Sequence, residues 1–323
     1  MATAKLVYNP AKPLLESGNQ ALEYFTRRDL LHDRVPAVST LWDLRPAVKI
    51  LGKQQNDGSW RYGGKVNVPG MRSGYDQIET FRQIGLLIEE FGFTRDHPAI
   101  ARAAEFLLSF QSVEGDIRGI YGNQYTTTYT TAIIELLLKA GCDESDTRID
   151  RCLKWLISAR QEDGGWAIPV RTHGINIFEV NSLEETVEPD RGKPFSHLVT
   201  GMALRALAAS KKYQKSAEAR GAALLLTSRF FKRDVYGDRN TVLYWLSFSY
   251  PYWFTDLMTS LDSLARLGFS TTEPKIAEAI AWFVERQSPD GTFSELKLLR
   301  NRDKELYLWI TLQLARIFES FQR

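Results

Sequence analysis

The sequence has little cysteine, almost no net charge and no long apolar run. Its two cysteines, Cys142 and Cys152, are too few for a disulfide framework and fit buried thiols in a reducing compartment. No apolar stretch approaches the roughly 18 residues of a membrane span, and the opening MATAKLVYNPAKPLL has no apolar core of a secretory signal. A net charge of +2 argues against a dedicated nucleic-acid surface. We therefore expect a cytoplasmic, soluble protein that binds no nucleic acid.

Several catalytic signatures are also missing. The chain has no His-Glu-X-X-His, no Walker loop and no dinucleotide fingerprint, so we expect no metal and no cofactor. What it does have is a 44% hydrophobic and 25% charged composition, typical of a globular core, with eight Trp and thirteen Tyr. These aromatic residues need a place in the fold or in a site.

An internal repeat predicts the fold. Four segments align on a turn glycine, at Gly58, Gly115, Gly164 and Gly291. In each, an apolar helical end is followed by Gln, a short polar turn with Gly, and usually an aromatic residue: LGKQQNDGSW, LLSFQSVEGDI, LISARQEDGGW and FVERQSPDGTF. The 127-residue gap between the last two predicts a degenerate copy near residues 225–237, with Arg229 in the place of Gln.

The segments between these turns read as helices. Apolar residues recur at i, i+3, i+4 and i+7, Pro98 and Pro274 lie in expected first turns, and Gly141 and Gly268 lie at expected ends. Nothing reads clearly as a strand. We predict an αα-hairpin of about 50–60 residues repeated about five times, with an N-terminal extension at 1–37 and a single domain at 38–323.

The turn motif resembles the QW repeat of the terpenoid cyclase and protein prenyltransferase superfamily, which includes squalene-hopene cyclases. This resemblance covers roughly residues 38–320 and implies an all-α (α/α) toroid of about five to six hairpins. In that family the outer helices end in the motif and the inner helices line a central cavity. The resemblance gives Gln55, Trp60, Gln161, Trp166 and Gln287 a scaffold role, with Gln capping a helix end.

In such a toroid the inner helices begin after each turn, and their starts gather at one mouth. The candidate catalytic residues there are Asp76, Asp256 and His197. The candidate substrate-binding residues are Tyr75, Glu79, Tyr125, Tyr129, Tyr252, Trp253, Tyr307, Arg72, Lys193 and Arg302. Helix N-termini and nearby cations attract anions, so an aromatic cavity under a cationic rim suits a hydrophobic substrate, including a prenyl diphosphate.

Structural roles compete with these assignments. Asp76, Thr127, Ser196 and either Thr255 or Asp256 lie where N-caps are expected. His197 is equally compatible with a hydrogen-bonded core histidine, and Tyr or Trp at helical spacing is usually core. Two long segments, 167–194 and 232–250, are expected to be lids or binding loops.

The sequence departs from the family's catalytic motifs. No two aspartates are adjacent, so both the Asp-X-Asp-Asp acid of class II cyclases and the Asp-rich magnesium motif of class I enzymes are absent. His197 stands near the position of the missing acid. Asp150 and Cys152 have the spacing of a prenyltransferase zinc pair, but their place at the start of an outer helix favours a cap and a core thiol.

Three functions follow from these observations. The first is an isoprenoid-binding enzyme resembling cyclases and prenyltransferases, with Asp76 or Asp256 as proton donor or cation stabiliser. The second is a non-catalytic toroid that binds a lipid or a partner. The third is a glycan-acting hydrolase or lyase, which requires two carboxylates about 5–9.5 Å apart. The expected partner is a hydrophobic small molecule, and peripheral membrane contact is compatible with it.

Overall fold

The computed structural model describes residues 4–66, 71–176, 179–237, 241–299 and 303–322. The chain forms two compact units. We call residues 38–222 the central unit, and residues 1–37 with 223–323 the terminal unit. Each is described by itself.

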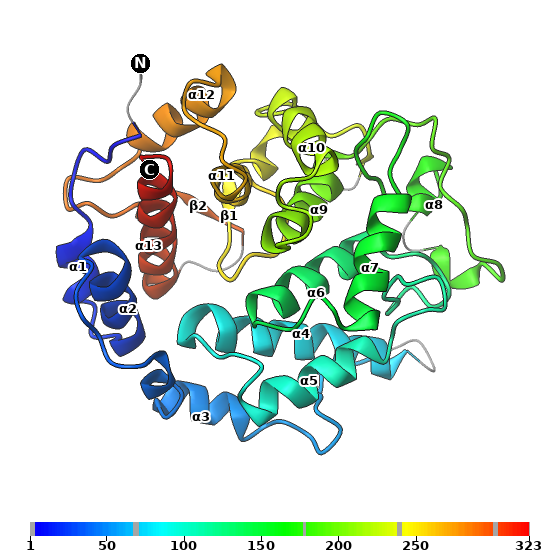
Figure 1. Ribbon diagram of the computed structural model, residues 1–323, viewed down its shortest axis with the longest axis horizontal. Helices are drawn as coiled ribbons and strands as arrows, with labels where there is room; N and C mark the ends of the chain where they lie inside the picture. The colour runs from blue at the N-terminus through cyan, green and yellow to red at the C-terminus, as the bar shows by residue number, and fades with distance from the viewer. Residues whose placement is uncertain (1–3, 67–70, 177–178, 238–240, 300–302, 323) are drawn as a thin grey trace. The chain divides into compact units, whose positions relative to one another are not determined.

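The central unit consists of helices joined by turns and loops (Figure 1). Its α-helices are α3 (Arg45–Leu51), α4 (Arg72–Phe91), α5 (Pro98–Leu108), α6 (Thr127–Lys139), α7 (Thr147–Ser158), α8 (Pro169–Thr172) and α9 (His197–Ala209). Two 3-10 helices, η2 (Val38–Leu41) and η3 (Val180–Ser182), complete it, and α10 (Ala217–Ser228) starts in this unit and ends in the other. Helices α4 and α5 pair, as do α6 and α7, while α6 packs along α9.

The terminal unit joins the two ends of the chain. It contains α1 (Ala11–Leu15), α2 (Gln20–Phe25), the π-helix η1 (Thr26–Leu30), the 3-10 helix η5 (Val242–Tyr244), α11 (Leu257–Arg266), α12 (Pro274–Val284) and α13 (Lys304–Ser320). Helix α13 packs against α1, α2 and η1, so the first and last helices lie side by side (Figure 1). Two parallel two-residue strands, β1 (Ser247–Phe248) and β2 (Lys297–Leu298), correct the prediction that nothing forms a strand.

The helices begin and end at the proline and glycine residues that the sequence predicted. Pro98 and Pro274 are the first residues of α5 and α12, where a missing N–H removes no helical hydrogen bond. Gly141 and Gly268 follow the ends of α6 and α11 with φ of +82° and +76°, a backbone conformation that stops a helix and favours glycine. These stop signals are confirmed.

Three of the repeated turns use a glutamine in the same way. The side-chain nitrogen of Gln111 donates to the carbonyl of Gly115, four residues later, at 3.1 Å, and to that of Arg148 in α7 at 2.7 Å. Gln54 and Gln287 make the equivalent pairs of bonds. Each glutamine thus closes its own turn and ties it to a neighbouring segment of the chain.

The motif glutamine of the first turn is Gln54, so the assignment to Gln55 is wrong. The Gln55 side chain is half-buried and reaches only the carbonyl of Lys53. In the shorter third turn, Gln161 donates instead to the carbonyls of Asp190 and Lys193. In the degenerate fourth turn Arg229 takes the place of Gln. Its guanidinium donates to the carbonyl of Arg233, four residues later, as the glutamines of the first, second and last turns do.

The last residue of each of the four turn motifs is tied to the helix that follows it. The backbone N–H groups of Trp60, Ile117, Trp166 and Phe293 donate to the hydroxyls of Thr80, Thr130, Thr200 and Thr311, at 2.9 to 3.1 Å. The indole N–H groups of Trp60 and Trp166 donate back to the carbonyls of Ile50 and Leu156, in the helices before their turns. The turn residue therefore links the helices on either side of it.

The turn glycines leave no room for a side chain. A Cβ on Gly58 would lie 2.3 Å from the carbonyl oxygen of Arg102, and one on Gly291 would lie 2.5 Å from that of Asn9. Both glycines also have positive φ, which other residues rarely adopt. Glycine is therefore required at these positions for two reasons, the positive φ of the turn and the close packing of the neighbouring backbone.

A buried ionic network joins the helices of the central unit. The Arg205 guanidinium in α9 lies 2.8 Å from the Glu135 carboxylate in α6, and Lys139 bridges Glu135 and Glu89 of α4. Burial opposes ionisation of Glu135, but the two cations outweigh it and lower the pKa of Glu135. Breaking such a network leaves an uncompensated buried charge, so these contacts fix how α4, α6 and α9 pack.

In the parts of the chain that the structure describes, no helix combines the length and the apolar character needed to cross a membrane.

Candidate functional site

Asp76 lies inside a helix, which corrects its expected place at an N-cap. Helix α4 begins at Arg72, four residues earlier. The Asp76 side chain is 1% exposed. Its carboxylate accepts from the Arg61 guanidinium at 2.7 Å and from the Tyr62 backbone N–H at 2.8 Å. With the Arg72 guanidinium 3.5 Å away, this carboxylate organises the start of α4, and its role as an acid stays a prediction.

The same contacts position a tyrosine. Arg72 donates to the Tyr62 carbonyl at 2.8 Å, so the Tyr62 backbone is held on one side by Asp76 and on the other by Arg72. Its ring lies 5.1 Å from that of Tyr75, centroid to centroid. We call Arg61, Asp76 and Arg72 the ion cluster. Its contacts to the Tyr62 backbone fix the position of the Tyr62–Tyr75 ring pair.

A second tyrosine pair adjoins the first. The rings of Tyr121 and Tyr129 stack at 5.8 Å with an interplanar angle of 20°. Burial and the neighbouring hydroxyls of Tyr121 and Tyr75 raise the pKa of Tyr129. Tyr62, Tyr75, Tyr121 and Tyr129 are all half-buried, and we call them the tyrosine cluster. Aromatic faces of this kind bind apolar chains and cations.

Two glycines allow the tyrosine pairs to meet. A Cβ on Gly74 would lie 2.9 Å from the backbone nitrogen of Ile120, and one on Gly119 would overlap the Gln77 side chain. Gln77 also donates to the Arg118 carbonyl at 2.7 Å. The start of α4 is thus packed directly on the 118–120 backbone, which brings Tyr121 toward Tyr75.

Tyr125 is part of a loop contact. Its hydroxyl donates to the Glu188 carboxylate at 2.8 Å, and the Arg118 guanidinium lies over its ring. Burial and the Glu188 carboxylate raise the pKa of Tyr125 to about 12, so the hydroxyl remains a donor at neutral pH. Gln124 also donates to the Glu185 carbonyl and accepts from the Val187 N–H. These hydrogen bonds hold this part of the 167–194 segment next to the start of α6.

The start of α9 confirms one N-cap and buries the candidate histidine. Ser196 caps the helix by accepting from the Val199 N–H. His197 is its first residue and is 3% exposed. Thr127 is not a cap, since it is the first residue of α6 and donates to the Ala167 carbonyl. Lys193 is half-exposed and lies 3.9 Å from Asp190.

The remaining candidate carboxylate on α4 has partners of its own. Glu79 accepts from Arg82 at 3.1 Å and from Gln83 at 2.6 Å. Asp76 is equally engaged, by Arg61 and the Tyr62 N–H. The glycan-acting hypothesis stays a prediction.

The other candidates belong to the terminal unit. Asp256 is the N-cap of α11 and forms a capping box with Thr259, as its capping role predicts. Tyr252 is buried with its ring 5.7 Å from that of Tyr250, Trp253 lies edge-on to Phe254, and Tyr307 is half-buried in the first turn of α13. Arg302, like Arg239 and Arg300, lies outside the described residues.

The sequence did not identify Tyr62 and Tyr121 of the tyrosine cluster, nor Arg61, the ion-pair partner of Asp76. Arg61 and Tyr62 directly follow the aromatic residue of the first turn, and Tyr121 precedes the predicted start of α6. None of the three lies at a predicted helix start. The available signal was the short stretch between each turn and the next helix, since that stretch must cross the same end of the unit.

Cys152 behaves as predicted for a core thiol, whereas Cys142 is only half-buried. Burial raises the pKa of Cys152 to about 12, and its sulfur accepts from Gln111 at 2.9 Å. Asp150 points away and is bound by Lys154 and Lys212, both at 2.7 Å. Asp150 therefore lies on the surface of α7 and Cys152 lies in its core. The N-cap of α7 is Asp146, so Asp150 is not the predicted cap.

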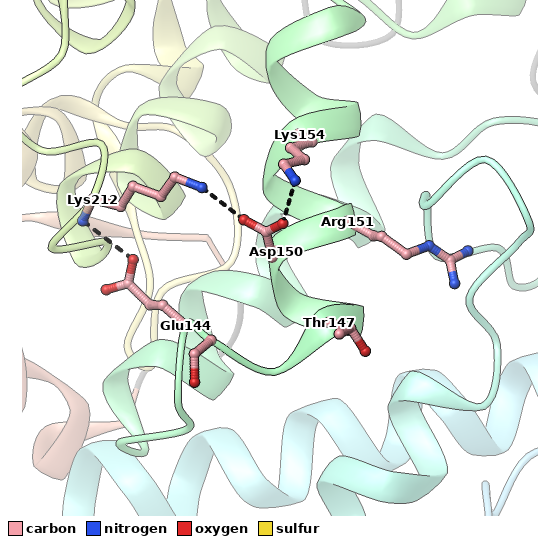
Figure 2. Close-up of a pocket in the computed structure, with 7 residues that line it drawn as sticks. Glu144, Thr147, Asp150, Arg151, Lys154 and Lys212 are labelled. Atoms are coloured by element: carbon pink, nitrogen blue, oxygen red, sulfur yellow. Dashed lines mark hydrogen bonds and ion pairs between the residues drawn. The ribbon is translucent and has the colours of Figure 1, made fainter.

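A surface hollow of about 560 Å³ lies around Asp150 (Figure 2). Lys154 and Lys212 converge on Asp150. Glu144 accepts from the Lys212 backbone N–H, and the Arg151 side chain extends away from them. The Arg151 guanidinium binds the Ser112 and Val113 carbonyls. Because Asp150 holds both lysines and backbone carbonyls hold Arg151, the cations of this hollow are already engaged, and it is a weaker candidate than the tyrosine cluster.

Comparisons with known proteins bear on the fold. Residues 79–239 match the family model of the squalene-hopene cyclase C-terminal domain. Over 87 residues, 27% of this chain, the sequence is 32% identical to "Probable squalene–hopene cyclase" of Sinorhizobium fredii (strain NBRC 101917 / NGR234). That segment spans only 13% of the relative's length.

Solved structures agree with the family match. The type II terpene cyclase MstE from Scytonema, without ligand, has a TM-score of 0.50 and 14% identity, over 88% of this chain and 77% of its own. A substituted MstE in complex with geranylgeranyl dihydroxybenzoate, its substrate, gives the same values over 76% of its chain. At this identity the likeness concerns the fold. The predicted all-α fold class and the resemblance to the terpenoid cyclase superfamily are thus both confirmed.

Proposed function

We propose that this protein binds an isoprenoid at the tyrosine cluster and acts on it as a terpene cyclase-like or prenyltransferase-like enzyme. The observation that carries the proposal is the tyrosine cluster itself, four half-buried rings beside the ion cluster of Arg61, Asp76 and Arg72. Its occurrence on a terpene cyclase-like fold supports an isoprenoid over other apolar ligands.

The aromatic rings suit both the ligand and its reaction. An isoprenoid chain buries apolar area against ring faces, and each buried CH₂ contributes about 0.8 kcal/mol. A carbocation formed along the chain would be stabilised by the negative ring faces, by about 0.5–2 kcal/mol for each good contact. Tyr75 and Tyr129 are the central pair in this proposal.

The ion cluster suits an anionic head group such as a diphosphate. Two guanidiniums and one carboxylate leave a net charge of +1, and the side chains of Arg61 and Arg72 are 53% and 50% exposed. Each guanidinium has five N–H donors, of which only some are engaged by Asp76 and Tyr62. In this proposal Asp76 positions the two cations, and His197 of the same unit is the candidate for proton transfer.

One observation favours a second function, a non-catalytic isoprenoid-binding protein. The chain lacks the Asp-X-Asp-Asp motif, Asp76 is held by two arginines, and Asp256 caps α11. These structural partners account for the burial of both carboxylates without a catalytic role. Cytoplasmic location and membrane contact stay predictions for either function.

Binding and turnover distinguish the two functions. The purified chain is titrated with farnesyl diphosphate, geranylgeranyl diphosphate and squalene, and products are analysed by mass spectrometry. Binding with a new product supports the enzyme, and binding with unchanged ligand supports the non-catalytic function. No binding of any of the three ligands refutes both.

Variants locate the site. We expect Tyr75→Ala and Tyr129→Ala to weaken binding of all ligands by at least about tenfold, the equivalent of 1.4 kcal/mol. Arg72→Gln should weaken only the diphosphates. The matched control is Tyr213→Ala, which removes a half-buried tyrosine of the central unit outside the cluster. Equal losses in the control and the cluster variants would place binding elsewhere.

A further inference from the structure

Two buried donors on α13 of the terminal unit have no acceptor. They are the indole nitrogen of Trp309 and the side-chain nitrogen of Gln313, and no described residue accepts a hydrogen bond from either. Trp309 is 2% exposed and Gln313 is 7% exposed. Buried donors in folded proteins are nearly always paired, so two of them together call for an explanation.

Three other buried indoles of the fold do find acceptors. The indole N–H groups of Trp60, Trp166 and Trp245 donate to backbone carbonyls at 2.8, 2.7 and 2.8 Å. Trp309 departs from this pattern, and a second buried donor without a partner, Gln313, lies about one turn further along α13.

The two donors are held on one face of the helix. Residues four apart on an α-helix are neighbours, about 5–6 Å between their Cβ atoms, so a single oxygen can accept from both. The Trp309 ring is fixed by stacking on Tyr250 at 5.6 Å and by edge contact with Phe25 at 6.2 Å. The donor position is thus set by aromatic packing.

We propose that Trp309 and Gln313 form a second binding position, which holds an uncharged oxygen of a ligand such as the hydroxyl or carbonyl of an oxygenated isoprenoid. Both donors are neutral, and their surroundings are aromatic. The next arginine on the helix, Arg316, is already bound by Asp29 through two nitrogens, so it adds no free charge. Only the choice of an isoprenoid skeleton rests on the proposed function.

The first test needs no ligand. In the ligand-free full-length protein, Gln313→Leu and the straighter Gln313→Met remove donors that have no partner, so the melting temperature should rise by about 1–3 °C. The matched control Gln111→Leu removes a glutamine that makes its hydrogen bonds, and it should lower the melting temperature. A fall in both Gln313 variants would mean that a bound water already satisfies the donor, and would overturn the proposal.

The second test uses farnesol and the hydrocarbon farnesene, which differ chiefly in one hydroxyl. The wild type should bind farnesol about 2–10 times more tightly, the value of one hydrogen bond, and Gln313→Leu should bring the ratio to about one. Equal affinities in the wild type would overturn the proposal. If neither compound binds, the isoprenoid function fails as well, and a raised melting temperature would still support an oxygen-binding position for another ligand.

Discussion

The turns and the starts of the helices that follow them obey different rules. Each described turn closes through the same kind of contact, a Gln or Arg side chain on a carbonyl four residues later or, in the third turn, on the adjoining loop. The helix starts share no such pattern: the N-cap is Met71 at α4, Thr126 at α6, Ser196 at α9, Asp256 at α11 and Asp303 at α13, and only the last three accept a capping hydrogen bond with their side chains. Repetition marks the scaffold, and variation marks the place where a site can be built.

This comparison predicts that turn substitutions change stability and that helix-start substitutions change binding. The largest stability effect is expected for Trp166→Ala. Trp166 is fully buried and makes two hydrogen bonds through its nitrogens. Its removal should cost about 3–5 kcal/mol, measured by urea denaturation. A loss below about 1 kcal/mol would refute the scaffold role of the turn aromatic.

The buried network of α6 and α9 should make stability depend on acid pH. The pKa of Glu135 is lower in the folded protein than its ordinary value of 4.5. Its contribution is therefore complete above about pH 4.5 and is lost as the pH falls further. Glu135→Gln should lose about 3–5 kcal/mol at neutral pH because Arg205 keeps a buried charge.

The same variant should also show a flatter decline in stability between pH 5 and pH 3 than the wild type. Denaturation at several pH values measures both effects. Parallel pH profiles of the two proteins would contradict this role of Glu135.

Neighbouring glutamines offer a sharper version of the comparison. Gln54→Leu should cost about 1–3 kcal/mol, because the carbonyls of Gly58 and Ala99 lose their donor. Gln55→Leu should stay within about 0.5 kcal/mol, since the one hydrogen bond of that side chain is local and open to solvent. The pair differs by one position in sequence, so thermal denaturation of both tests the corrected register directly. Equal losses would restore the original assignment.

A small stability effect is also expected at the candidate site. Tyr129→Phe keeps the ring stacked on Tyr121 and removes only the hydroxyl, so we expect a change of about 1 kcal/mol or less. Binding of squalene should persist, since it depends on the ring face. If Tyr129→Phe unfolds the protein, the tyrosine cluster is part of the scaffold and the comparison fails.

Much of the fold could be predicted because its signals are local. A glycine with positive φ, a proline at the first position of a helix and an apolar stripe of period 3.6 each act within a few residues. Gly141, Pro98 and the turn glycines therefore read correctly. The register at Gln54 and Gln55 did not, because which glutamine closes the turn depends on carbonyls in α5.

The site was predicted only in part for the same reason. Tyr75 and Tyr129 were identified from their places near helix starts, and the structure brings them together. Tyr62 and Tyr121 lie outside the helices, in stretches between a turn and the next helix where no helical periodicity marks a residue. Asp76 seemed to be a cap because the start of α4 could not be located without its contacts to Arg61 and Tyr62.

By itself the sequence determined the helical hairpins, their turns and the residues that the turns require, since backbone conformation and periodic burial are written into neighbouring residues. Tertiary structure alone decided that Arg61, Tyr62 and Tyr121 join Tyr75 and Tyr129, and that Trp309 and Gln313 are left without acceptors. Those outcomes depend on residues that are distant in sequence. Their distances and partners exist only once the helices have packed.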